Sequence, residues 1–171
     1  MSAADAMCPL PLDCSEVYGE LTIDDWSLHG PAWCAHDLSP LYESPELRGE
    51  NVLVESLAGR IARPMLTDET EYALRMMFSG ATDRTGTPYV NAPGGLHANR
   101  RAFTERLIDP IRNGTASLAA ELVIPDENGD PITLLFDVQP LRLEWRLLPN
   151  AYARAVLELR VPVPEFTEEY A

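Results

Sequence analysis

The chain has 171 residues with 27 acidic and 13 basic side chains, which gives a formal net charge of −14, and 46% of its residues are hydrophobic. This length fits one domain, this hydrophobic content is too high for a disordered acidic chain, and no apolar run approaches the roughly 20 residues that span a bilayer. The N-terminus lacks the basic and apolar regions of a secretory signal, and so acidic a protein is not expected to bind nucleic acid through a broad basic face.

The first part of the chain is acidic and is predicted to be irregular. Residues 1–17 contain two prolines and no hydrophobic period, which predicts an extended N-terminal arm. Short strands are expected over 18–23 and 26–28, and three prolines make 30–47 an irregular segment. The whole stretch 1–47 holds nine acidic residues and no basic one.

The same stretch contains all three cysteines. An odd number of cysteines without a signal peptide predicts no disulfide framework. His29, Cys34 and His36 are spaced as His-x4-Cys-x-His, with Cys14 as the candidate fourth ligand, and this matches no usual zinc spacing. Nucleophile-elbow and phosphate-loop patterns are missing as well. We therefore expect packing or loop roles here, and neither a metal, a cofactor nor an enzymatic activity.

The middle of the chain combines a long loop with the first strongly patterned elements. A short β-prone run at 51–54 precedes 55–70, a long loop of the kind that usually carries function. Hydrophobic residues alternate over 72–78, which predicts a strand with one buried face. After a turn-rich connection, a hydrophobic stripe at helical spacing predicts one helix over 96–108, ended by Pro110.

The last part of the chain is predicted to be strands. Hydrophobic alternation marks 118–124, 132–138 and 141–147, with a bulge or bend at Pro140, because proline cannot donate to a ladder. A last strand covers 155–161. Together the elements predict a mainly β (α+β) fold, an antiparallel β-sandwich or partly open barrel with one flanking helix.

This pattern divides the chain into three parts. They are the extended N-terminal arm 1–17, a single β-rich domain 18–164 and an acidic C-terminal tail 165–171. All 13 basic residues are arginines within 48–164, which has a net charge of only −2. Either the acidic ends only keep the protein soluble, or they dock on arginine-bearing surfaces of neighbouring subunits, since the planar guanidinium suits such interfaces better than lysine.

Charged residues alternate along the outward faces of the last two strands. They are Arg142, Glu144 and Arg146 on one strand and Arg154, Glu158 and Arg160 on the other. Opposite charges on antiparallel neighbours can pair across the strands. This surface is either solvated or meets a neighbouring subunit or channel.

Several segments, taken in order, resemble tail proteins of long-tailed, siphovirus-like bacteriophages, especially those that infect actinobacteria. They are Asp-Leu-Ser-Pro-Leu at 37–41, Arg-Gly-Glu-Asn-Val-Leu-Val at 48–54, Gly-Arg-Ile-Ala-Arg-Pro at 59–64, Gly-Leu-His-Ala-Asn at 95–99 and Ala-Arg-Ala-Val-Leu-Glu-Leu at 153–159. The resemblance covers roughly residues 20–165 and depends on the order and spacing of these pieces.

The resemblance implies the fold that tail-tube, tail-terminator and distal-tail ring proteins share. In that family the subunits form rings, usually hexameric, around a lumen through which viral DNA passes, and there are no catalytic residues. For this chain it implies a virion protein that is assembled in the host cytoplasm. A tail-tube subunit is the favoured role, and a tail-terminator or distal-tail ring protein is the second choice. Its expected partners are copies of itself, other tail or connector proteins, and DNA only as non-specific cargo, with no membrane.

Two sets of residues are expected to serve such an assembly. The expected subunit interface comprises Arg48, Glu50, Asn51, Arg60, Arg63, Arg142, Arg146, Arg154 and Arg160. The expected lumen-facing residues are Glu144 and Glu158, because a negative lumen repels DNA phosphates and lets the genome slide.

A carbohydrate- or protein-binding β-sandwich module is the alternative function. It requires an exposed aromatic platform, for which Trp26, Trp33 and Tyr42 are the candidates.

Overall fold

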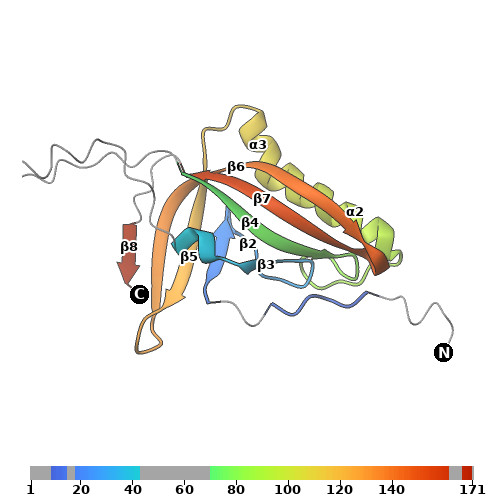
Figure 1. The fold of residues 1–171 in the computed structure, drawn as a ribbon, viewed down its shortest axis with the longest axis horizontal. Helices are drawn as coiled ribbons and strands as arrows, with labels where there is room; N and C mark the ends of the chain where they lie inside the picture. Colours follow the sequence, from blue (N-terminus) through green and yellow to red (C-terminus); the bar gives the residue numbers. More distant parts are fainter. Residues whose placement is uncertain (1–8, 15–17, 43–69, 162–166, 171) are drawn as a thin grey trace, which may run out of the picture.

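The computed structural model describes residues 9–14, 18–42, 70–161 and 167–170 (Figure 1). The strands are β1 (Glu20–Ile23), β2 (Trp26–Ser27), β3 (Trp33–Asp37), β4 (Thr70–Ser79), β5 (Leu118–Pro125), β6 (Pro131–Leu148), β7 (Tyr152–Val161) and β8 (Thr167–Tyr170). The helices are α2 (Ala92–Phe103), a π-helical turn η3 (Thr104–Ile108) and α3 (Asp109–Arg112), with short 3-10 turns η2 (Ser39–Tyr42) and η4 (Pro149–Ala151). The predicted mainly β, antiparallel fold with one flanking helix is therefore confirmed.

The strands form one curled antiparallel sheet in the order β2-β1-β5-β6-β7-β4-β3, with β8 paired to β6. Between the two ends of this order, the Leu28 N–H donates to the Leu21 carbonyl and the Leu28 carbonyl accepts from the Ala35 N–H. Leu28 thus links β1, near one end of the strand order, to β3, at the other end. The curled sheet is a half-barrel whose two edges are hydrogen-bonded to each other through this residue. β8 lies in the segment that was expected to be an acidic tail, and its pairing with Ile132–Leu135 extends the sheet.

β6 is the longest strand and organises the sheet. Its first half pairs with β5, and its second half pairs with β7. The register with β7 shifts between Pro140 and Arg142, which confirms the bulge expected at this proline, although one 18-residue strand replaces the two strands that were predicted.

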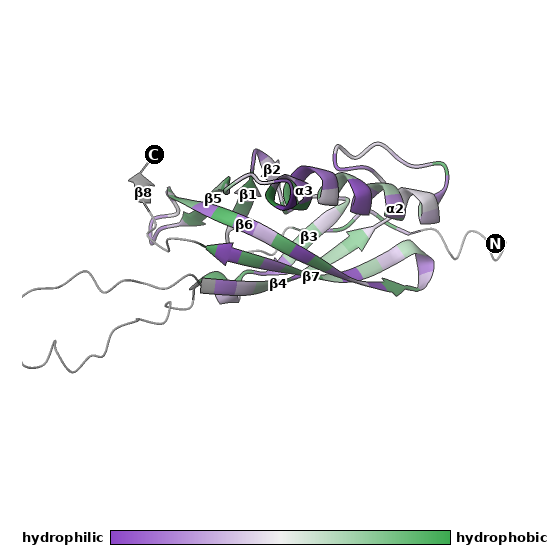
Figure 2. Cartoon of the chain, turned by 90° about the horizontal axis from the view of Figure 1, so that it is seen from above, coloured by the Kyte–Doolittle hydropathy of each residue, from purple (hydrophilic) through white to green (hydrophobic). Residues whose placement is uncertain are grey.

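The core lies between the inner face of the sheet and the helix (Figure 2). Alternate residues of β4, from Tyr72 to Phe78, point inward and are at most 6% exposed, as their period of two predicts. Phe103 packs edge-on against both Trp33 and Phe78, which are tilted against each other, and the ring centroids of the three lie 5.3–5.9 Å apart. This aromatic cluster fastens the helix to β3 and β4.

The helix begins at Ala92, four residues before the predicted start. The Asn91 side chain caps it by accepting a hydrogen bond from the Gly94 N–H, and Gly80 and Gly95 allow the start of the helix to lie close to the connection that follows β4. A Cβ on Gly95 would lie 2.3 Å from the Tyr89 ring. The helix also continues beyond its predicted end, because Pro110 occupies the first turn of α3, where its missing N–H removes no bond. None of the described helices has the length and apolar composition that a membrane crossing requires.

The prediction of an irregular segment over 30–47 is wrong for part of that segment. Residues 33–37 form β3, which pairs with β4, and residues 39–42 form the turn η2. The run Trp33-Cys34-Ala35 is buried on both sides, so it shows no alternation that would have marked a strand. The expected β-prone run 51–54 and long loop 55–70 fall outside the described residues except at Thr70, where β4 begins.

The described part of the N-terminal arm, residues 9–14, is bonded to the domain. The Leu10 N–H donates to the Tyr152 hydroxyl, the Leu10 carbonyl accepts from the Ser79 hydroxyl, and a disulfide joins Cys14 to Cys34. The disulfide contradicts the expectation drawn from the odd cysteine count, which overlooked that two of three cysteines can pair. It closes a loop across 20 residues of sequence, so the segment is covalently fastened to the sheet.

Candidate functional site

The outer face of β4, β7 and β6 is a charged surface whose rows are set by the strand register. Arg142 lies opposite Glu158, and Arg146 lies opposite Arg154. On the other side of β7, Glu71 lies opposite Arg160 and Met77 lies opposite Arg154. Because side chains directly opposite on antiparallel strands are close neighbours, each row brings together particular charges.

At one end of this face the arginines are neutralised. Arg142 forms ion pairs with Glu144 and, at 3.0 Å, with Glu158, while Arg160 forms an ion pair with Glu71 at 3.0 Å. We call these five residues the paired end. The cross-strand pairing expected from the sequence is confirmed here.

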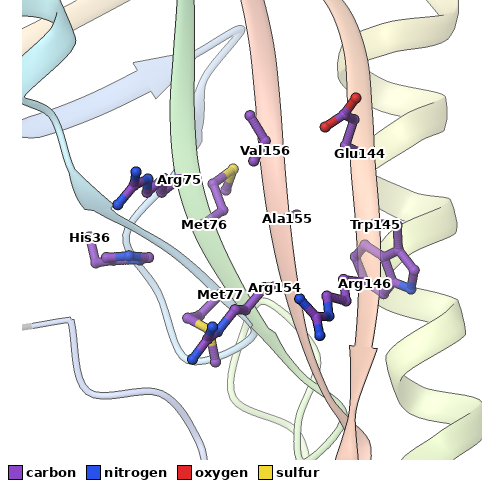
Figure 3. Close-up of a pocket in the computed structure, with 10 residues that line it drawn as sticks. All are labelled: His36, Arg75, Met76, Met77, Glu144, Trp145, Arg146, Arg154, Ala155 and Val156. Atoms are coloured by element: carbon purple, nitrogen blue, oxygen red, sulfur yellow. The ribbon is translucent and has the colours of Figure 1, made fainter.

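At the other end the face is hollowed to a volume of about 790 Å³ (Figure 3). The hollow lies over the middle of β4 and β7, and we call it the arginine hollow. The residues that line it are His36, Arg75, Met76, Met77, Glu144, Trp145, Arg146, Arg154, Ala155 and Val156. Glu144 therefore belongs both to the paired end and to the rim of the hollow. His36 belongs to it because the register of β3 against β4 shifts between Ala35 and Asp37, and the intervening residue is exposed.

Two of these arginines lack an acidic partner in the described part of the chain. Arg146 and Arg154 lie opposite each other, and the nearest acid along β6, Glu144, is engaged by Arg142. Arg75 differs, because Asp37 lies opposite it on β3. Hydrogen bonds from Ser39, with a smaller contribution from Arg75, hold the pKa of Asp37 below its usual value, so this acid is a carboxylate.

Two like charges directly opposite on neighbouring strands destabilise a sheet. The Arg146–Arg154 row therefore works against folding unless an anion from outside the described residues neutralises it. Guanidinium groups bind carboxylates through two parallel hydrogen bonds, which gives such a contact both energy and orientation. The arrangement is suited to docking a carboxylate-rich surface.

The expected interface and lumen residues divide into two groups. Arg48, Glu50, Asn51, Arg60 and Arg63 lie outside the described residues. Arg142, Arg146, Arg154 and Arg160 share the outer face with Glu144 and Glu158. The two glutamates both contact Arg142, and whether they line a lumen stays a prediction. Sequence reasoning missed His36 and Arg75, whose place in the hollow depends on the register of β3.

The tryptophans expected as an aromatic platform do not form one. Trp33 is a core residue at 2% exposure, and Trp26 stacks on it with ring centroids 5.8 Å apart. The guanidinium groups of Arg84 and Arg106 lie 4.4 and 5.4 Å from the Trp26 ring centroid. Trp26 is therefore packed between the core and two cations, which leaves no open aromatic face for a sugar ring.

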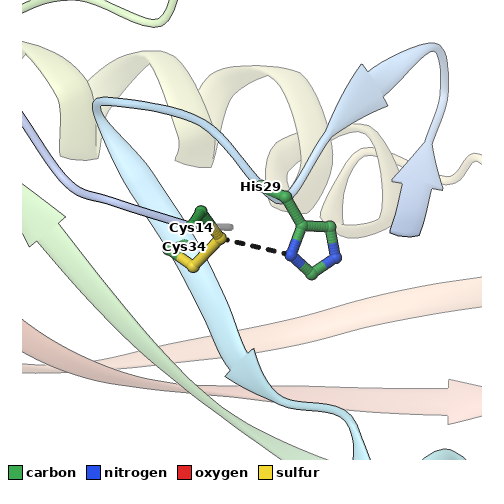
Figure 4. A group of neighbouring side chains, drawn as sticks. All are labelled: Cys14, His29 and Cys34. Carbon is green, nitrogen blue, oxygen red and sulfur yellow. Dashed lines mark hydrogen bonds between the residues drawn. A yellow bond between two sulfur atoms is a disulfide. The ribbon is translucent and has the colours of Figure 1, made fainter. Parts of the chain in front are cut away.

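A second cluster of chemically active side chains lies at β3. Cys14, His29 and Cys34 come together from three separate segments, with the Cys14 Sγ 3.4 Å from the His29 Nδ1 (Figure 4). Burial lowers the pKa of His29, which favours its neutral form, while Glu20 acts in the opposite direction to a smaller extent. The Nε2 atom of the same ring is buried and has no hydrogen-bond partner among the residues that the structure describes.

No family model, curated protein or solved structure matches this chain.

Proposed function

We propose that this protein is a structural subunit of a bacteriophage tail that assembles with copies of itself into a ring or tube around a lumen for DNA. A hexameric tail-tube subunit is the first assignment, and a tail-terminator or distal-tail ring protein is the next. Two things support the proposal: the resemblance of residues 20–165 to such tail proteins, and a surface suited to contacts between copies.

The observation that carries the proposal is the unpaired Arg146–Arg154 row in the arginine hollow. In a monomer, two opposed arginines lower the stability of the sheet because like charges repel. In an interface that supplies carboxylates, each arginine forms a favourable contact with an opposite charge. The paired end, on the same strands, shows that this sheet can neutralise its arginines internally where acids are in register.

The occupant that fits the hollow is a second copy of the chain. Residues 1–47 hold nine acids and 165–171 hold three, with no basic residue in either stretch. A copy that presents one of these ends to the hollow of its neighbour makes a head-to-tail contact, and such contacts close into a ring when the rotation permits. Charge complementarity of this kind also speeds encounter and fixes the register of the two copies.

An acidic ring is also suited to non-specific passage of DNA. With a net charge of −14 per subunit, an assembly repels phosphates unless arginines face them, and the proposed contact occupies Arg146 and Arg154. DNA is then cargo in the lumen and is not held by it.

The oligomeric state of the purified full-length chain tests the proposal. We expect sedimentation velocity to show a concentration-dependent assembly, and negative-stain microscopy to show rings or short tubes. A chain that stays monomeric at the highest soluble concentration, alone and when co-expressed with tail proteins, contradicts the proposal.

A further inference from the structure

Three metal-ligating atoms meet where the N-terminal segment crosses β3. The Cys14 Sγ, the Cys34 Sγ and one ring nitrogen of His29 all lie within 4.8 Å of one another. Cys14 comes from the arm, His29 from the connection after β2, and Cys34 from β3 (Figure 4). Cys34 is 5% exposed, so the group is shielded but open on the side of its two half-buried partners.

The spacing of these atoms is close to that of a tetrahedral metal site. With Zn–S bonds of about 2.3 Å and Zn–N bonds of about 2.0 Å, the sulfur and nitrogen ligands of one zinc ion lie roughly 3.5 Å apart. The Cys14 Sγ and the His29 Nδ1 are already 3.4 Å apart. Tetrahedral binding further requires that the two sulfurs, now bonded to each other, separate to about 3.8 Å, and that the Cys34 Sγ, now within 4.8 Å of a His29 ring nitrogen, comes to about 3.5 Å from it.

We propose that the reduced form of this protein binds one zinc ion through Cys14, His29 and Cys34, with water in the fourth position. The disulfide and the zinc site are alternative states of the same cluster. A phosphine reductant and one water cleave the S–S bond: phosphorus is oxidised to its oxide with the water oxygen, and each sulfur takes one proton. Zinc then displaces both thiol protons into solvent and forms two Zn–S bonds.

The role of the site is to fasten the N-terminal segment in either redox state. The disulfide joins residues 9–14 to β3 under oxidising conditions, and the zinc ion makes the same connection when the cysteines are reduced. Because the ligands come from separate segments, metal binding is expected to stabilise the fold and not only the loop. The inference concerns the fold of one chain, and it holds or fails independently of the proposed tail assembly.

Metal binding by the full-length chain tests the proposal. The protein is reduced with a phosphine, freed of metal with a chelator under anaerobic conditions, and titrated with zinc against a chromogenic indicator. We expect about one zinc per reduced chain, none for the oxidised chain, and a higher melting temperature for the reduced chain when zinc is present. Cobalt in place of zinc should give the charge-transfer absorption of thiolate ligands.

Matched variants assign the ligands. His29→Ala should weaken zinc binding by at least about tenfold, and the double variant Cys14→Ser with Cys34→Ser should lose the thiolate band in cobalt spectra. Cys8→Ser removes the third cysteine, and His36→Ala removes an exposed histidine two residues from Cys34, so both should bind as the parent does. A reduced parent chain that binds no zinc overturns the proposal, as does zinc binding that survives His29→Ala unchanged or is lost on removal of Cys8 or His36.

Discussion

The paired end and the arginine hollow are two parts of the same sheet face and are built from the same strands. They differ in whether the arginines form ion pairs with acidic residues of the described chain. At the paired end, Arg142 and Arg160 contact three glutamates. In the hollow, Arg146 and Arg154 face each other without an acidic partner among the described residues. At the paired end the neutralising acids come from the same chain, whereas no ion pair to a described residue neutralises the two arginines in the hollow.

The difference arises from which residue of β7 the register places opposite each arginine of β6. β6 reads Arg142-Leu-Glu-Trp-Arg146, so an acid separates two arginines along one face. β7 presents Glu158 opposite Arg142, but it presents Arg154 opposite Arg146. A single position, 154, therefore decides whether the second row is an ion pair or a repulsive pair.

The largest expected effect comes from reversing the charges of the hollow. Arg146→Glu combined with Arg154→Glu would turn the proposed contact with a neighbour's carboxylates into repulsion. We expect a loss of about 2–5 kcal/mol of association free energy, as is found when a buried interfacial charge loses its partner. Sedimentation velocity over a concentration series measures this as a shift from assembly to monomer.

The matched control makes the same charge change at the paired end, with Arg142→Glu and Arg160→Glu. This variant breaks ion pairs within one chain, so its melting temperature should fall while its assembly constant stays close to that of the parent. Equal loss of assembly in the two double variants would mean that total charge, and not the hollow, governs association.

The sequence predicts the elements of this fold better than it predicts the site. Alternation from Tyr72 to Phe78 marks β4 because only one face of that strand is buried. β3 is not predicted because Trp33, Cys34 and Ala35 are all buried, so the strand shows no alternation of hydrophobic and polar residues. Cys34 is covered on one side by the arm, to which its disulfide connects it. The disulfide is not predicted either, because Cys14 and Cys34 come together only when the arm lies against the sheet.

The hollow is out of reach of sequence reasoning for a related reason. The alternation of charged and hydrophobic residues along β6 and β7 correctly predicts that their arginines share one face of the sheet. Which arginine faces which acid depends on how β7 is paired with β6 past the bulge at Pro140. A register shift of one position would have exchanged the two faces of the strand.

A smaller effect is expected at the paired end from Glu158→Gln, which removes one partner of Arg142. Both side chains are substantially exposed, at 54% for Arg142 and 40% for Glu158, so solvent screens the pair. We expect a loss of about 0.2–1 kcal/mol in the free energy of unfolding, measured by urea denaturation, and no change in assembly. A loss well above this range would indicate that the pair does more than neutralise a surface.

The smallest effect expected, and of opposite sign, is that of Arg154→Gln in the hollow. Glutamine keeps much of the side-chain length but removes one of two opposed charges, so the unassembled chain should become more stable by a few tenths of a kcal/mol. Urea denaturation at concentrations below assembly measures this, and raising the salt should shrink the gain because screening already weakens the repulsion. If the variant is instead less stable than the parent, Arg154 has a stabilising partner within its own chain, and the hollow is then another paired end.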